Sequence, residues 1–510
     1  MATEGAPRRS KRLRKSASQV PTIGHQPGDI GSISISPPPA TGAPDPKPSG
    51  AGSRHLDLGA GGVDHTMALP DAVIEDIISL LPTKDAGRAQ AVSPRWRVLW
   101  RTAPLNLDCL ELFFPDTAAA TDAAATAISG IISSHHGPGR RFRVDTRFFH
   151  THPETADAWL GSPALDNLQE LDMCDYQICQ VTTARPPLPP SALRFSPCLR
   201  VATLTYCSIS DGVAQGVRFP QMKKLALERV SISDGALQRL ISNGCPILEC
   251  LLLGLNSCCA RIKSASLRSI GVRSLVWYNE SPVPGIVELI IEEAPCLEKL
   301  LFLEEHVGLR VRVIQGAAPK LETLGGLYDT DNYFRFVFGS MVIERGLNVI
   351  GSRTVMRSVK VLAVSIFNLS LDRVIDLMMR FPCLETLYVE SCRYVDKNLW
   401  RRKHHHLLRS FDIRLKTLVF LNYRGIKSQL NFATFFILNA KLLETMRFVG
   451  RSCYMDNKDF IYRQYASLEV EKRASIGAKF YFTTDKCGDH LTHARHVHDL
   501  SITDPFECTC

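Results

Sequence analysis

The densest group of potential metal ligands lies in the stretch CGDHLTHARHVHD, which begins at residue 487. Its thiol and imidazole groups, together with two cysteines downstream, are Cys487, His490, His493, His496, His498, Cys508 and Cys510. Such side chains suit zinc, whose protein ligands are mostly cysteine and histidine. The stretch contains no paired CxxC, however, and its spacing matches no closed four-ligand site. We therefore expect no metal here and interpret the histidines as surface residues.

Patterns that carry catalysis or phosphate binding are absent from the sequence. It contains no GxxxxGK[ST], GxGxxG, HExxH or GxSxG, patterns that supply a phosphate cradle, metal ligands or a nucleophile. The histidine triplet at 404–406 lies in the charged stretch WRRKHHHLLRS, which we interpret as a solvated loop. We expect a non-catalytic protein that needs no cofactor.

The overall composition is that of a soluble globular protein. Of 510 residues, 45% are hydrophobic and 22% are charged, which is enough for two or three folded units. We expect no membrane span, because no apolar run reaches about 18 residues, and no secretory signal, because no apolar segment follows the basic N-terminus. We therefore expect an intracellular protein. Its 16 cysteines should then be mostly reduced and buried.

The net charge of +9 reflects a mild excess of 60 basic over 51 acidic residues, which does not by itself indicate a nucleic-acid binder. Basic residues gather in the stretch APRRSKRLRKSAS: Arg8, Arg9, Lys11, Arg12, Arg14 and Lys15. This cluster is a candidate nuclear-import signal, or else a plain solvated tail. It belongs to a Pro- and Gly-rich leader, residues 1–65, which we expect to be disordered. We expect the protein in the nucleus, the cytoplasm or both.

The segment 69–108 predicts three short helices. Pro70 suits the first turn of the first helix, apolar residues recur in it at three- and four-residue steps, and Pro82 ends it. Thr83 can cap the second helix. Ser93, followed by a proline, begins the third, which carries two tryptophans. So small a module cannot bury all of its large apolar side chains alone, so some of its surface needs a partner.

The sequence LPDAVIEDIISLLPTKDAGRAQAVSPRWRVLW resembles the F-box, and the tail WRTAPLNLD looks like its grass-plant form. In that family the three-helix module docks on a Skp-type adaptor, which bridges to the cullin scaffold of a ubiquitin ligase. The resemblance implies an F-box over residues 66–108. It also implies an adaptor-facing set of Leu69, Pro70, Ile74, Ile77, Leu80, Leu81, Pro82, Ala91, Trp96 and Trp100. On the residues alone, the same side chains could form the core of an ordinary helical domain.

Between residues 109 and 165 the sequence predicts a helix followed by a strand. The alanine-rich stretch DTAAATDAAATAISGIISSHH favours the helix. In FRVDTRFF, Phe142 and Val144 alternate with charged residues, which is typical of a half-buried strand. The alternative, a basic-aromatic surface for nucleic acid, fits this alternation less well.

A leucine-rich phrase recurs from about residue 165 onward, at intervals typical of leucine-rich repeats. It begins at residues 167, 197, 220, 246, 295, 319, 358, 382, 415 and 442, with PILECLLLGL and PCLEKLLFL as examples. Alternating leucines predict one short strand per phrase, and SDGALQRLISNGCP predicts a helix between phrases. Stacked units of this kind form a solenoid with one parallel sheet. The alternative is a compact α/β domain, since some phrases lie far apart, such as those of Leu324 and Leu362.

Residues 355–510 resemble the FBD region that follows the repeats in many plant F-box proteins. The resemblance rests on FPCLETLYVES, LKTLVFLNYRGIKSQLNFATFFILNAKLLETMRFVG, RASIGAKFYF and HVHDLSITDPF. We expect this region to form terminal repeats that close the stack begun by repeats over 109–354. The predicted fold is therefore α/β: a disordered leader, a three-helix F-box and a curved leucine-rich-repeat solenoid with a parallel sheet.

The resemblance implies a substrate-recognition adaptor of an SCF-type (Skp–cullin–F-box) ubiquitin ligase. The F-box would bind the Skp-type adaptor, and the broad concave face of the repeats would bind an unknown protein substrate. Such a subunit positions its target and supplies no acid, base or nucleophile. Two alternatives stay open: a leucine-rich-repeat scaffold that has lost adaptor binding, and a nuclear nucleic-acid-associated protein that uses the basic cluster.

Overall fold

The computed structural model of the protein describes residues 69–112, 117–174, 185–254, 259–273, 287–305, 308–329, 334–344, 346–351, 354–391, 412–485 and 491–507. By its internal contacts the chain divides into two compact units, Met1–Asp64 and His65–Cys510. All of the described residues belong to the second unit. The predicted disordered leader and the basic cluster of residues 8–15 lie outside the described residues.

Three short helices open the second unit, as the sequence predicts: α1 (Asp71–Leu80), α2 (Thr83–Ala89) and α3 (Pro94–Thr102). Ser93 caps α3, because its hydroxyl accepts the backbone N–H of Trp96 at 3.3 Å. The prediction that Thr83 caps α2 was wrong. Thr83 is the first residue of that helix, and its hydroxyl instead accepts the backbone N–H of Asp108 at 2.8 Å.

The chain passes from the third helix directly into the main sheet. β1 (Leu105–Asp108) pairs in parallel with β2 (Gly139–Asp145), and α4 (Ala118–Ser134) connects them. The buried ring of His135 holds this junction: its Nε2 lies 2.9 Å from the carbonyl oxygen of Ala103, and the ring packs edge-on against Trp100. The helical module and the first strands are thus tied together by side-chain contacts.

The predicted strand over FRVDTRFF ends earlier than expected, at Asp145, and α5 (Arg147–Thr151) follows it. The buried carboxylate of Asp145 explains the change. It accepts the backbone N–H of Arg147 at 2.8 Å and also pairs with the Arg147 guanidinium, so an anion stabilises the first turn of the helix. Phe148 and Phe149 are buried on this helix rather than on a strand.

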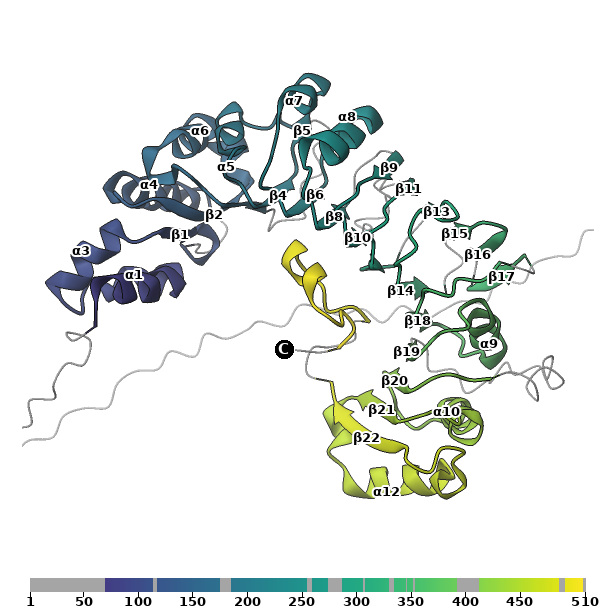
Figure 1. The fold of residues 1–510 in the computed structure, drawn as a ribbon. Coiled ribbons are helices and arrows are strands. Elements are labelled where there is room, and N and C mark those ends of the chain that lie inside the picture. The colour runs from purple at the N-terminus through teal and green to yellow at the C-terminus, as the bar shows by residue number, and fades with distance from the viewer. Residues whose placement is uncertain are drawn as a thin grey trace, which may run out of the picture. The chain divides into compact units, whose positions relative to one another are not determined.

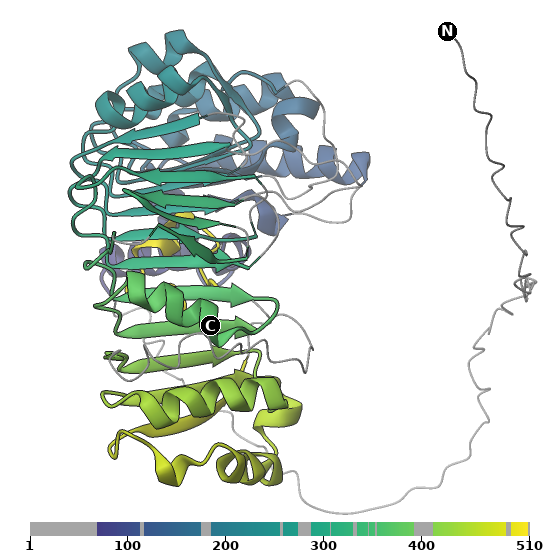
Figure 2. The same ribbon diagram turned by 90° about the vertical axis from the view of Figure 1, so that its right-hand side faces the viewer.

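Fourteen parallel strands form the main sheet of the described residues (Figures 1 and 2). In order they are β1, β2, β3 (Glu170–Cys174), β4 (Val201–Thr205), β6 (Lys224–Glu228), β8 (Cys250–Gly254), β10 (Ser269–Arg273), β12 (Lys299–Phe302), β14 (Thr323–Tyr328), β18 (Val361–Ile366), β19 (Thr386–Ser391), β20 (Thr417–Leu421), β21 (Thr445–Gly450) and β22 (Lys479–Thr484). Each of the ten leucine-rich phrases contributes one of these strands, so the prediction of a repeat sheet is confirmed.

The strands stack in register, which aligns equivalent side chains of successive repeats. Leu225 pairs with Leu251, Leu251 with Ile270, Ile270 with Leu300, and Leu300 with Leu324. All five side chains are buried. Because a strand alternates its side chains between two faces, a constant register directs every such residue into one continuous core.

β10 occupies the wide interval between the phrases that begin at 246 and 295, and the leucine-rich pattern did not reveal it. The sheet also continues without a break at residue 355, because β14 pairs with β18. The predicted segments 109–354 and 355–510 therefore share one sheet.

The sequence predicts helices between the leucine-rich phrases, and this was only partly correct. These helices include α7 (Asp211–Gly216), α8 (Asp234–Arg239), α9 (Leu371–Arg380) and α10 (Lys427–Asn439). Between residues 259 and 350 a second sheet replaces the helices: β9 (Cys259–Lys263), β11 (Glu288–Glu293), β13 (Arg310–Val313), β15 (Arg335–Phe338), β16 (Met341–Glu344) and β17 (Asn348–Ile350). The sequence RVRV of β13 shows the reason, because Val311 and Val313 are buried while the arginines are exposed, a period of two that suits a strand.

The remaining elements are short. They are α6 (Pro153–Gly161), α11 (Ser452–Met455), α12 (Lys458–Ser467), the paired strands β5 (Ser208–Ile209) and β7 (Ser231–Ile232), a π turn η5 (Leu240–Gly244), and the 3₁₀ turns η2 (Cys109–Leu112), η3 (Pro163–Leu165), η4 (Pro190–Phe195), η6 (Val470–Lys472) and η7 (Val497–Ser501). Within the described parts of the chain, no helix combines the length and apolar character needed to cross a lipid bilayer.

The face of the main sheet that points away from this core, here called the free face, is covered in its middle by residues 491–507. Apolar side chains of this segment, such as Val497 and Leu500, form a second hydrophobic cluster with Leu252 and Leu301 of the strands. Figure 1 shows the segment in yellow beside β8 and β10, on the side opposite β9 and β11. The central strands are therefore buried on both faces, as is usual for parallel sheets.

Candidate functional site

The three-helix module exposes several large apolar side chains. Leu80 of α1 is 77% exposed, Val98 of α3 is 63% exposed, and Val92, which lies between α2 and α3, is 58% exposed. Val73 of α1 is also exposed. Single exposed apolar residues are common on protein surfaces, but several on one small module indicate a surface for another protein. These four residues are called the exposed apolar set below.

The ten residues predicted to face an adaptor fall into three groups. Exposed are Pro70, Leu80, Pro82 and Ala91; half-buried are Leu69, Ile77 and Leu81; buried are Ile74, Trp96 and Trp100. The buried three belong to the core of the module, together with Ile78 and Leu99. They support the module from within, and the exposed and half-buried members are the ones available to a partner. Contact of any of them with an adaptor stays a prediction.

The predicted set lacks Val73, Val92 and Val98, although the structure exposes all three. The spacing of residues in the third helix indicates one of them, Val98. In the third helix Trp96, Leu99 and Trp100 lie three and four residues apart and define the buried side. Val98 falls off that stripe, and an apolar residue outside the buried stripe is a candidate for contact with a partner.

Polar contacts brace the module. The guanidinium of Arg95 in α3 donates to a carboxylate oxygen of Asp71 at 2.8 Å and to the carbonyl oxygen of Leu69 at 2.5 Å. Thr102 of α3 donates to the carboxylate of Glu75 in α1 at 3.1 Å. These bonds hold the first half of α1 against both ends of α3.

The free face of the repeat sheet, predicted to bind a protein substrate, is the second candidate surface, and segment 491–507 covers its middle. Leu491, Val497, Leu500 and Phe506 are at most 2% exposed. The segment is also held by polar bonds, for example from the ammonium of Lys224 to the hydroxyl of Ser501 at 2.9 Å. The middle of the free face is therefore already occupied by the chain itself.

Charged side chains line the free face on β1 to β3, next to the segment. The Arg143 guanidinium lies between the carboxylates of Asp108 and Asp172, at 3.3 and 2.9 Å. Burial raises the pKa of Asp172 above its ordinary value, although Arg143 opposes this effect. The neighbouring Glu170 pairs with Arg141 at 3.1 Å and with His498 of the segment at 2.9 Å. These charged side chains are paired within the chain and lie beside the part of the free face that segment 491–507 covers.

Comparison with known protein families assigns three parts of the chain. A family model described as F-box domain matches residues 67–108, and one described as the LRR repeats of the FBD-associated F-box protein At5g56370 matches residues 156–389. A model described as FBD matches residues 405–448. The chain thus carries an F-box, LRR repeats and an FBD region, the three parts named in the F-box/FBD/LRR-repeat proteins that it resembles. The first match coincides with the three-helix module, and the second spans β3 to β19 of the repeat sheet.

Similar proteins occur in Arabidopsis thaliana. The putative F-box/FBD/LRR-repeat protein At4g00315 is 30% identical over 253 residues, which are 48% of this chain and 54% of that protein. The F-box/FBD/LRR-repeat protein At1g13570 is 28% identical over 193 residues, 37% of this chain and 44% of the other. The FBD-associated F-box protein At5g60610 is 24% identical over 413 residues, 75% of this chain and 99% of the other. The chain thus spans about half the length of the first two relatives and nearly all of the third.

The described cysteines are free thiols, but only Cys109, Cys207, Cys245 and Cys250 are buried, so the prediction that most cysteines are buried was only partly correct. Burial raises the pKa of the thiols of Cys207 and Cys245 to about 12. The thiolate is the reactive form of cysteine, so these side chains act as small apolar residues of the core.

The histidines considered as zinc ligands have structural partners where they are described. His498 pairs with Glu170, and His496 precedes η7, where its backbone N–H donates to Asp499 at 2.8 Å. No group of three or more potential metal ligands occurs among the described residues. Cys487, His490, Cys508 and Cys510 lie outside them, as does the triplet at 404–406.

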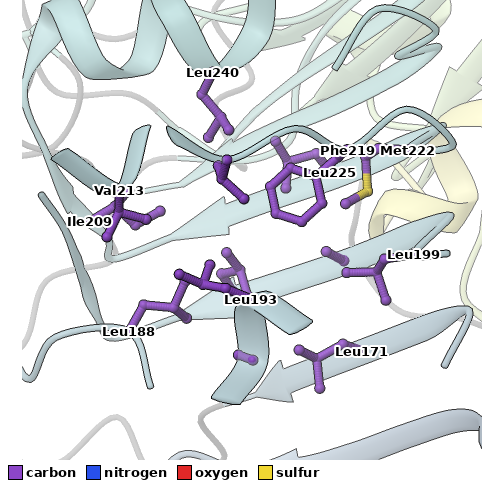
Figure 3. A pocket seen from close by; sticks show the side chains of 14 residues that line it. Leu171, Leu188, Leu193, Leu199, Ile209, Val213, Phe219, Met222, Leu225 and Leu240 are labelled. Atoms are coloured by element: carbon purple, nitrogen blue, oxygen red, sulfur yellow. The ribbon is translucent and has the colours of Figure 1, made fainter. Parts of the chain in front are cut away.

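A small cavity inside the repeats does not provide a ligand site. Its volume is about 20 Å³, and apolar side chains from β3 to η5, including Leu171, Phe219 and Leu240, line it (Figure 3). That volume is close to the roughly 10–15 Å³ that one water requires, but a water also needs two to four polar partners. The cavity is a packing gap in the core.

Proposed function

We propose that this protein is the substrate-recognition adaptor of an SCF-type ubiquitin ligase. In this proposal the F-box module binds a Skp-type adaptor, and the repeats bind a protein substrate that is to be ubiquitinated. The family matches support the F-box and the repeats as such. The Skp-type partner and the substrate are inferred from the family.

The observation that carries the proposal is the exposed apolar set on the F-box module. Leu80 and Val98 expose most of their surface although the module has its own buried core. Leaving such side chains in water forgoes about 1.5–3 kcal/mol each relative to burial. A partner that covers them would gain that free energy.

The contribution of such a subunit is positional. A substrate held on the repeats has its lysines close to the ubiquitin-conjugating enzyme of the complex, which raises their effective concentration. This role requires two binding surfaces on one rigid support. The junction at His135 and the continuous sheet supply that support.

The test is co-purification of the full chain with a Skp-type adaptor after Leu80→Asp and Val98→Asp, alone and combined. A charge at either position should weaken binding at least about tenfold, because an unpaired carboxylate would have to be desolvated in the interface. Leu442→Asp is the matched control, because Leu442 is 51% exposed in the last repeats. Unchanged co-purification of the double variant would contradict the assignment of this surface.

A further inference from the structure

The buried side chains of segment 491–507 follow a regular spacing. Leu491, Ala494, Val497 and Leu500 lie three residues apart, all are buried, and Phe506 adds a fifth anchor six residues later. A 3₁₀ helix has three residues per turn, and the structure forms such a turn at Val497–Ser501. The segment thus presents these apolar side chains to the free face, while Arg495, His496 and Thr503 are exposed.

The free face is shaped to receive these side chains. A Cβ atom on Gly271 of β10 would lie 2.8 Å from Leu500 Cδ2, which is closer than real Cβ contacts. A Cβ atom on Gly325 of β14 would collide with the ring of Phe506. The two glycines therefore leave space on the free face for the side chains of Leu500 and Phe506. Around them the face is apolar, with Leu252 and Leu301 in contact with the segment.

Polar groups of the strands bind the segment in two ways. Lys224 donates to the carbonyl oxygen of His498 at 3.3 Å, and Lys299 donates to that of Ile502. Bonds to backbone carbonyls can be made by any peptide. At the other end Tyr388 donates to the carboxylate of Asp504 at 2.7 Å, and Arg447 pairs with Glu507 at 2.7 Å. These two contacts select acidic side chains.

We propose that the free face from β6 to β21 is a peptide-binding groove that segment 491–507 fills in cis. The groove recognises a segment with apolar side chains at every third position, followed by an aromatic residue flanked by acidic ones. If the repeats bind a substrate as proposed above, a substrate segment of this chemistry competes with residues 491–507 for the same groove. The chain then holds its own recognition surface closed until such a segment displaces residues 491–507.

The first test uses the unmodified full chain and native-state hydrogen exchange. The amides of Asp499 and Ile502, bonded within the segment, should exchange through local opening, at least about tenfold faster than the ladder amides of β10 and β12. A segment that is a fixed part of the core would exchange only with the strands, and that result would overturn the proposal.

The second test uses a release variant, Leu500→Asp with Phe506→Ala, in the full chain. A synthetic peptide of residues 491–507 should bind this variant at least about tenfold more tightly than the wild type, whose groove is occupied. A peptide with the same two substitutions should bind neither. Thr503→Asp is the matched control in the chain, because Thr503 is exposed within the segment, and it should behave as the wild type.

A substitution on the free face tests where the peptide of residues 491–507 binds. Tyr388→Phe in the release variant should weaken the binding of the peptide, because the hydrogen bond to Asp504 is lost. A folded release variant that binds the peptide no better than the wild type overturns the proposal. So does a release variant that fails to fold, because residues 491–507 would then be a fixed part of the core. The same variants should still co-purify with a Skp-type adaptor. If the wild type itself does not bind this adaptor, the proposed function is rejected, but the peptide-binding measurements still test the groove.

Discussion

The hydroxyl of Tyr388 in β19 lies 2.7 Å from a carboxylate oxygen of Asp504, a residue 116 positions further along the chain. Burial and the Asp504 carboxylate raise the pKa of Tyr388 well above its ordinary value. The phenol therefore stays protonated and acts as the donor. Its ring also packs against Phe506 at 5.3 Å between centroids. One strand residue thus holds both an acidic and an aromatic side chain of segment 491–507.

We predict that Tyr388→Phe loosens the segment without disturbing the sheet. Loss of a hydrogen bond to a charged acceptor costs about 1.5–3 kcal/mol, so the amide of Phe506, which is bonded to Asp504, should exchange faster. Hydrogen exchange of the full chain measures this change. Tyr462→Phe, at a tyrosine that is 78% exposed, is the control and should leave the exchange unchanged. Equal rates in both variants would show that the hydroxyl contributes nothing.

Gly271→Ala should destabilise the protein, because the added methyl group would collide with Leu500. Overpacking of this kind typically costs about 1–3 kcal/mol, measured as a lower free energy of unfolding in urea. Gly130→Ala is the matched control. Gly130 lies in α4 with no atom near an added Cβ, so that variant should gain about 0.5–1 kcal/mol. Equal stability of Gly271→Ala and the wild type would place Leu500 elsewhere.

Trp96→Ala and Leu80→Asp should affect adaptor binding for different reasons. Trp96 is buried in the module, so its removal should cost about 3–5 kcal/mol of stability and lower adaptor binding through unfolding of the helices. Leu80 is mostly exposed, so Leu80→Asp should lower binding with little change in the melting temperature. Circular dichroism melts of both variants, recorded beside the co-purification, separate the two effects. A large loss of stability in Leu80→Asp would contradict its surface placement.

The contact between Glu170 and segment 491–507 should weaken in acid. Burial raises the pKa of Glu170, but the hydrogen bond with His498 and the charges of Arg141, His498 and Lys224 hold it below its ordinary value of 4.5. A carboxylate with a lowered pKa stabilises the folded state fully above pH 4.5, and this contribution is lost as the pH falls through the lowered pKa. The stability difference between the wild type and Glu170→Gln should therefore shrink in acid. Glu471→Gln, at an exposed glutamate, is the control, and a difference independent of pH would contradict the prediction.

We also propose that the basic cluster of residues 8–15 directs the protein to the nucleus. Replacing Arg8, Arg9, Lys11, Arg12, Arg14 and Lys15 by alanine should shift a fluorescent fusion of the full chain toward the cytoplasm. An unchanged distribution would favour a plain solvated tail. DNA binding that survives deletion of residues 1–65 would favour the nucleic-acid alternative instead.

Most of the repeat sheet could be predicted from the sequence because its cause is local. A phrase such as PCLEKLLFL gathers leucines over a few residues, and this local pattern predicts the strand β12. β10 escaped notice because its strand SIGVR has Gly271 where the adjacent strands carry Leu252 and Leu301. That glycine leaves space for Leu500, more than two hundred residues away. The second sheet was missed because the helix of SDGALQRLISNGCP was extended to repeats whose segments alternate with a period of two.

The candidate surfaces were predicted less completely. The resemblance located the F-box, but it did not separate Trp96 and Trp100, which build the core, from Leu80, which points outward. Burial depends on how three helices pack together, and spacing along one helix gives only part of that information. The covered free face was unpredictable for a similar reason: residues 491–507 gain their role from distant strands. Their spacing of three was visible in the sequence, but nothing nearby showed what it would contact.

Segment 491–507 reaches from Glu170 on β3 to Arg447 on β21. Repeats in a solenoid ordinarily contact only their neighbours, so this chain has a brace that most repeat stacks lack. The brace is translated after all of the strands that it crosses. Leu252, Leu301 and the other apolar residues of the free face therefore stay uncovered on the ribosome until residue 507 has emerged. Exposed apolar surface of this kind favours aggregation and chaperone binding, so the late stage of synthesis is when this protein depends most on cellular folding assistance.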